Sequence, residues 1–248
     1  MKLGIISTAL LCATTVAAPA AEFDIAGMKL GMNADQIVAR YQELRPEGQY
    51  SFSNWKLPEG SEWIANGRAL YNDLANPNDM EHERMQFAFT GLGSGNGLFA
   101  IQRDLKFRPS QRPSTDSIYA AAVKKYGEPS DISKSDTVVW AAWKFNSIDD
   151  ASAEKIGSLP GCLGGSDFPV GLDDHMAQKA RKYAEHCGLY IEITVRGGET
   201  GLANEIQMGM INYLDLLHDF DADNEDARRK IDAAKAKNAS DAAPVPEL

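Results

Sequence analysis

A glycine-rich loop between two apolar runs sets the first limit on how this chain can fold. The runs cover residues 85–90 and 98–107, and residues 91–97 between them have a glycine at every second position. Two apolar runs joined by such a loop indicate an antiparallel β-hairpin with a flexible tip. A dinucleotide-binding G-x-G-x-x-G loop would need glycine in place of Asn96 or Leu98, followed by a helix, and no P-loop motif is present. The loop therefore predicts a hairpin and not a phosphate site.

Helical patterns precede this hairpin and follow it. Asn33, with Gln36 three residues later, predicts a capping box at the start of one helix. Ser114 is expected to cap a second helix, which Gly127 ends, and a third helix is expected over residues 173–186. The residues expected to face inward on these helices are Ile37, Val38, Tyr41, Leu44, Tyr119, Ala122, Val123, Tyr126, Met176, Ala180, Tyr183 and Ala184.

Strand patterns occupy much of the remaining chain. Residues 137–145 are rich in β-branched and aromatic side chains, and residues 189–195 alternate cleanly between two sets of side chains. A partner strand is expected from about Asn204. The segments 54–83 and 148–173 are interpreted as loop-rich, because Pro and Gly are scattered through both.

The order of these elements predicts an α+β fold. We expect two helix-plus-antiparallel-sheet units in tandem, each ending in a glycine-rich hairpin, with the helices on one side of the sheet. The expected organisation is a signal peptide over residues 1–20, a first α+β unit over 21–110, a second α+β unit with a disulfide over 111–220, and a charged helical or disordered tail over 221–248.

The first twenty residues have the layout of a secretory signal. Lys2 is followed by an uncharged apolar stretch, and Ala18-Pro19-Ala20 offers a small-x-small cleavage site. We expect cleavage after Ala20, because cleavage after Ala18 would leave Pro19 at the new N-terminus. The protein is therefore expected in the periplasm or outside the cell.

Removal of this leader leaves two cysteines, Cys162 and Cys187. In an oxidising compartment, an even pair of cysteines predicts one disulfide bond. A redox-active pair is usually spaced as C-x-x-C, and these two are not. We therefore expect a structural disulfide.

The charge balance limits the partners of this chain. Its 248 residues include 25 Lys and Arg against 35 Asp and Glu, which gives a formal net charge of −10. An acidic chain is a poor binder of nucleic acid, because phosphate contacts need clustered basic side chains. No apolar run reaches the roughly 20 residues of a membrane-spanning helix. We expect no nucleic-acid partner and no transmembrane segment in the mature chain, and the oligomeric state stays open.

No motif points clearly to catalysis or to a metal. The nearest match to the G-x-S-x-G motif of hydrolases breaks at Phe168. His175 and His186 lie near the two cysteines, but without the closely spaced ligand pairs of zinc sites, and the acidic residues at 215–223 lack EF-hand spacing. We therefore expect no cofactor and no metal ion. A dispersed acid/His site stays open as an alternative, because such sites are defined by geometry.

The tryptophans are candidate binding residues. Trp140 and Trp143 are three residues apart in a strand-like run and are expected to point to opposite faces. Trp55 and Trp63 lie in the loop-rich stretch, where aromatic side chains often anchor a protein or glycan partner. We take Trp55 and Trp63 as possible partner-binding residues. The alternative is that they fold over the core.

Two short segments resemble parts of small exported bacterial proteins. Residues 27–32, followed by an amphipathic helix, resemble the opening of such proteins, and residues 125–130 are similar to their helix endings. The resemblance is to β-lactamase-inhibitor-protein-like and small outer-membrane-assembly-lipoprotein-like folds, and it implies helices on one side of an antiparallel sheet and protein binding rather than catalysis. The chain departs from the assembly lipoproteins, because Leu11 precedes Cys12 where a lipobox has Gly, Ala or Ser.

These observations predict a non-catalytic exported protein that acts as a protein-binding or accessory module of the cell envelope, with an envelope protein as its partner. The first alternative is an exported hydrolase with a dispersed acid/His site. The second is a small-ligand carrier, which would need an apolar cavity between the sheet and the helices.

Overall fold

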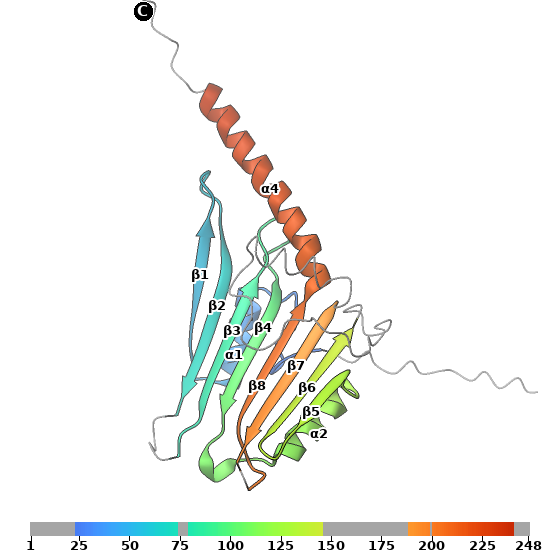
Figure 1. Ribbon diagram of the computed structural model, residues 1–248. Coiled ribbons are helices and arrows are strands. Elements are labelled where there is room, and N and C mark those ends of the chain that lie inside the picture. The colour runs from blue at the N-terminus through green and yellow to red at the C-terminus, as the bar shows by residue number, and fades with distance from the viewer. Residues whose placement is uncertain (1–22, 74–78, 146–187, 199, 241–248) are drawn as a thin grey trace, which may run out of the picture.

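One antiparallel sheet of eight strands organises the chain in the computed structural model, which describes residues 23–73, 79–145, 188–198 and 200–240 (Figure 1). The order across the sheet is β1-β2-β3-β4-β8-β7-β6-β5. The strands are β1 (Gln49–Lys56), β2 (Glu62–Asn72), β3 (His82–Phe89), β4 (Leu98–Lys106), β5 (Asp131–Lys134), β6 (Val138–Phe145), β7 (Leu189–Gly197) and β8 (Ala203–Asn212). The helices are α1 (Ala34–Leu44), α2 (Thr115–Tyr126) and α4 (Tyr213–Ser240), with a short 3₁₀ helix η1 (Pro109–Gln111). The predicted α+β class is confirmed.

The helices α1 and α2 begin where the sequence predicts. The Asn33 side chain accepts a hydrogen bond from the Gln36 N–H at 3.0 Å, and the Gln36 side chain accepts one from the Asn33 N–H at 3.0 Å. This is the expected capping box. Ser114 caps α2, since its hydroxyl accepts a hydrogen bond from the Ser117 N–H at 3.1 Å.

One hydrophobic cluster joins α1 and α2 to the same face of the sheet. Both helices lie behind the sheet in Figure 1. The alternation predicted for residues 189–195 is confirmed, because the four aliphatic residues of that run belong to this cluster and Tyr190 does not. Buried members of the cluster include Ile37, Tyr41, Met85, Phe87, Phe89, Ile101, Ala122, Tyr126, Trp143, Leu189, Ile191, Ile193, Val195 and Met210.

A smaller cluster of buried residues lies on the opposite face, at the end of the sheet where α4 begins. Its members are Ala88, Phe99, Ala100, Ala142, Tyr190, Ile211, Tyr213 and Leu216. The helix α4 continues directly from β8 and contributes Tyr213 and Leu216 to this cluster. It therefore departs from the expected placement of the helices on one side of the sheet. It also begins before residue 221, because burial of its first turns, and not the charge pattern, sets its start.

The interpretation of residues 54–83 as loop-rich is wrong over their described part. This stretch holds the end of β1, the whole of β2 and the start of β3. The strand β1 lies at the edge of the sheet, and every one of its residues except Phe52 is exposed. The alternation of Tyr50 and Phe52 with polar residues breaks at the register shift between Ser53 and Asn54. A Cβ at Gly67 of β2 would lie 2.4 Å from the Phe52 ring, so glycine is required for the ring to cover the strand.

Several predictions lie outside the described residues. They concern the leader over 1–20, the helix expected over 173–186, and the cysteines Cys162 and Cys187. Within the described ranges, no helix is both long enough and apolar enough to cross a membrane.

Candidate functional site

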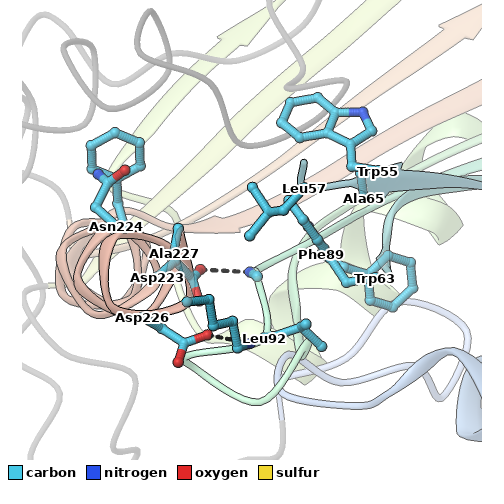
Figure 2. Close-up of a pocket in the computed structure, with 13 residues that line it drawn as sticks. Trp55, Leu57, Trp63, Ala65, Phe89, Leu92, Asp223, Asn224, Asp226 and Ala227 are labelled. Carbon is cyan, nitrogen blue, oxygen red and sulfur yellow. Dashed lines mark hydrogen bonds and ion pairs between the residues drawn. The ribbon is translucent and has the colours of Figure 1, made fainter. Parts of the chain in front are cut away.

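A groove opens at one end of the sheet, between the β1–β2 hairpin and α4. Figure 1 shows both elements extending past the central strands, with the β3–β4 loop between them. The groove has a volume of about 340 Å³ and is largely apolar. Trp55, Leu57 and Trp63 line it from the hairpin, and Asn224 and Ala227 line it from α4 (Figure 2).

Trp55 and Trp63 form the hairpin wall of the groove. They are direct partners in the β1–β2 register, and their rings pack edge to face with centroids 6.0 Å apart. Such cross-strand aromatic pairs stabilise a hairpin by roughly 0.2–1 kcal/mol. Trp55 stays 40% exposed, so its ring also presents an apolar surface to solvent. The two predicted binding residues are thus brought together, on paired strands and not in a loop.

Asp223 holds the helix wall in place. Its Oδ2 accepts a hydrogen bond from the Gly91 N–H at 2.5 Å (Figure 2). Its Oδ1 accepts one from the Ser94 N–H at 2.9 Å. The Ser94 hydroxyl lies 2.9 Å from both carboxylate oxygens. Hydrogen bonds to a charged group are about twice as strong as neutral ones. The loop expected to be a flexible hairpin tip is therefore bound to α4.

Glycines in this loop allow α4 to approach so closely. A Cβ at Gly93 would lie 2.7 Å from the carbonyl oxygen of Ala222, and a Cβ at Gly91 would lie 2.6 Å from Cγ of Asp223. Both distances are shorter than a carbon atom tolerates, so a larger residue would push the helix away. The glycine pattern thus reflects helix docking, which a search for phosphate-binding motifs does not detect.

Charge is divided sharply along α4. Residues 213–226 contain six Asp and Glu and no Lys or Arg, whereas residues 227–240 contain five Lys and Arg and one Asp. Near the junction, Nζ of Lys230 lies 2.5 Å from Oδ2 of Asp226, and this hydrogen bond lowers the pKa of Asp226. The acidic half of the helix lines the groove together with Ala227 and Lys230 from the start of the basic half, and the rest of the basic half projects beyond it (Figure 1).

A second charged cluster lies away from the groove, where α1 ends against β3 and β4. The buried Glu83 carboxylate accepts hydrogen bonds from Nε of Arg45 and, at 2.5 Å, from Nε of Arg103, and Arg45 also pairs with Glu81. Burial, together with the negative charge of Glu83, raises the pKa of Tyr41 to about 12. These ion pairs fix α1 to the sheet. No sequence pattern predicts them, because their members are brought together only by the fold.

The described residues gather no metal-binding group. Among them, no set of three or more His, Cys, Asp and Glu could hold a metal ion. His82 contacts the Asn72 amide oxygen through Nδ1, and His218 is exposed, with Nδ1 3.7 Å from the Asp219 carboxylate. His175 and His186, which the hydrolase alternative would use, lie outside the described residues.

Comparison with known proteins found no relative of this chain. A scan against protein-family models found no match, and searches of curated proteins and of solved structures found none either.

Proposed function

We propose that this protein is a non-catalytic exported module that binds another protein of the cell envelope through the groove between the β1–β2 hairpin and α4. The observation that carries this proposal is the Trp55–Trp63 pair, in which Trp55 is exposed and Trp63 is partly buried, and which lies across an apolar groove from α4. Tryptophan is enriched among the residues that dominate the energy of protein interfaces. An apolar groove with a charged rim is typical of such an interface.

The carboxylates in the groove support binding rather than catalysis. Asp223 accepts hydrogen bonds from the loop, and Asp226 is paired with Lys230. A general acid or base needs a pKa near the working pH and access to the proton that it moves. The lowered pKa of Asp226 and the structural bonds of Asp223 fit neither requirement.

Charge defines the chemistry of the partner. The charged α4 residues that line the groove are Asp223, Asp226 and Lys230, so this wall has an excess of one negative charge, and the whole chain carries a net charge of −10. The favoured partner is therefore an apolar segment flanked by Lys and Arg. Complementary charges speed association and fix specificity more than they raise affinity, so we expect slower binding at high salt.

The arrangement of the elements supports an accessory role by analogy of fold. The helix α1 precedes β1 to β4, α2 precedes β5 to β8, and β4 and β8 meet at the centre of the sheet. Two tandem helix-plus-sheet units would have this order. It supports the proposed likeness to β-lactamase-inhibitor-protein-like and assembly-lipoprotein-like folds, whose members tend to bind proteins.

The proposed location is the periplasm, reached by means of the leader over residues 1–20. N-terminal sequencing of the processed protein is expected to begin at Ala21. Thiol titration of the denatured, unreduced protein is expected to find no free thiol, because Cys162 and Cys187 are proposed to form a disulfide. An unprocessed chain in the cytosol would contradict the location, and two free thiols would contradict the disulfide.

Selection of peptides from a phage-displayed random library tests the groove directly. The library is panned against the wild-type protein, and the enriched peptides are titrated against Trp55→Ala and Tyr50→Ala. Tyr50 is a matched control, because it is an aromatic residue of the same strand with 42% exposure and lies outside the groove. We expect apolar peptides with Lys and Arg, bound at least about tenfold more weakly by Trp55→Ala and equally well by Tyr50→Ala. Equal binding to all three proteins would overturn the proposal.

A small-ligand carrier is the second candidate, favoured by the size of the groove. Its volume of about 340 Å³ lies within the range of small-molecule pockets. A carrier of uncharged apolar ligands would bind them with little dependence on salt, and the panning would then return no peptides whose binding is sensitive to salt.

A further inference from the structure

We propose that two copies of this chain pair through antiparallel α4 helices, so that side chains from the basic half of each α4 enter the groove of the other copy. This inference rests on the proposed function of the groove as a site for an apolar segment with basic flanks. The proposed segment is the basic half of α4, residues 227–240, from a second copy of the chain.

The apolar face of α4 continues beyond the groove. Phe220, Asn224 and Ala227 line the groove, and Ile231 and Ala234 follow at the same spacing of three and four residues. Residues at this spacing share one face of a helix. A polar residue such as Asn224 within such a stripe is known to fix the register between paired helices.

The basic half of α4 projects away from the sheet (Figure 1). Residues 235–240 are all exposed. Ion pairs within the helix, such as Arg229 with Glu225 at 3.2 Å, contribute only about 0.3–0.5 kcal/mol each. Replacing such weak pairs by contacts with a second copy therefore costs little.

An antiparallel pair satisfies the charges of both helices. It places the acidic residues 213–226 of each copy beside the basic residues 227–240 of the other, whereas a parallel pair would align like charges. Oppositely charged side chains in contact attract one another at short range. At physiological ionic strength, salt screens the repulsion between the two acidic molecules beyond about 8 Å.

The same pairing fills the groove with the side chains that it favours. The segment that enters carries Ile231 and Ala234 on its apolar face and Arg228, Lys235 and Lys237 at its sides. Twofold symmetry repeats this contact in both directions, so the assembly closes as a dimer and does not grow into a filament.

Sedimentation equilibrium of the purified protein, expressed from the whole chain, tests the dimer by measuring its molar mass. The variant R228E/K235E/K237E reverses three exposed bases of α4, and the control R68E/K106E/K124E reverses three exposed bases elsewhere for the same change in net charge. We expect a wild-type dimer at micromolar concentration, at least tenfold weaker dimerisation of the α4 variant, and no effect of the control. Equal weakening by both variants, or a monomeric wild-type protein, would overturn the proposal.

Cysteine cross-linking tests the orientation of the two helices. In an antiparallel pair centred near Ala227, the Ala227→Cys chains lie close enough to form a disulfide between copies. The Ala234→Cys chains would be separated by about 20 Å, at a rise of 1.5 Å per residue. We expect a cross-linked dimer for Ala227→Cys alone, and efficient cross-linking of both variants would show a parallel pair and contradict the proposal.

The dimer and the groove function fail in different ways. A monomeric wild-type chain that still binds displayed peptides through Trp55 would overturn the dimer and leave the groove function standing. If Trp55→Ala does not weaken the dimer and the protein binds no displayed peptide, the groove is the site of neither dimerisation nor peptide binding.

Discussion

The backbone N–H of Ser94 donates a hydrogen bond to Oδ1 of Asp223 at 2.9 Å, across 129 residues of sequence. This contact joins the β3–β4 loop at the end of the sheet to α4, about three turns from the start of the helix. Because the opposite wall of the groove is the β1–β2 hairpin, the position of α4 sets the width of the groove. The candidate site therefore depends on the carboxylate of Asp223, which holds α4 in position.

Replacement of Asp223 by Asn tests this anchor. The variant Asp223→Asn keeps one acceptor oxygen and turns an amide donor toward the donors of Gly91 and Ser94, so we expect a loss of about 1.5–3 kcal/mol in the free energy of docking α4. Hydrogen exchange of the α4 amides measures this loss. The control Asp232→Asn removes an exposed carboxylate on the same helix and is expected to leave the exchange of residues 213–226 unchanged.

Replacement of Gly93 by Ala tests the close approach of α4 to the loop. The new Cβ would lie 2.7 Å from the Ala222 carbonyl oxygen, so we expect destabilisation by about 1–3 kcal/mol in urea unfolding. Gly198→Ala is the control, because the nearest atom to its Cβ is Nδ2 of Asn204 at 3.9 Å. Equal stability of the two variants would show that the helix has room to move.

Removal of the Glu83 charge tests the ion pairs that join the end of α1 to β3 and β4. In Glu83→Gln, Arg45 and Arg103 lose a buried partner, and we expect destabilisation by about 3 kcal/mol at pH 7. Glu62→Gln is the control, because the Lys56–Glu62 pair is exposed and its loss is expected to change the free energy of unfolding far less. Urea unfolding of both variants beside the wild type provides the comparison.

The raised pKa of Tyr41 predicts how stability depends on alkaline pH. Its ordinary value is 10.0 and its value in the fold is about 12, so the unfolded chain releases this proton first as the pH rises. The stabilisation is complete below pH 10 and is lost between pH 10 and 12, at about 1.4 kcal/mol per pH unit. Tyr41→Phe is expected to remove this part of the pH dependence. It is expected to cost little at pH 7, because the buried hydroxyl has no hydrogen-bond partner among the described residues. A slope unchanged by the substitution would contradict the assignment.

Local signals in the sequence predicted the elements that depend on local chemistry. Asn33 and Gln36 form the expected capping box, and residues 189–195 alternate as expected. Both features depend only on residues that are close together in the sequence. Trp143 is buried and Trp140 lies against the other cluster, as their spacing predicted.

Features that depend on distant contacts were missed. The apolar alternation of the edge strand β1 breaks at the register shift before Asn54, so Trp55 was assigned to a loop, although its partner Trp63 was also selected. The contact of Asp223 with the glycine loop has no local pattern, because its members meet only when β8 brings α4 back beside the β3–β4 loop. For the same reason, the groove could not be predicted even though both of its tryptophans were candidates.

A photo-cross-linking amino acid in the hairpin wall identifies what the groove contacts. The whole chain is expressed with p-benzoylphenylalanine in place of Trp55, or in place of Tyr50 as the control, and the cross-linked segments are identified by mass spectrometry. We predict adducts from position 55, and not from position 50, to apolar segments rich in Lys and Arg, including residues 227–240 of a second copy. Equal adducts from both positions, or adducts from position 55 to acidic polar segments alone, would contradict it.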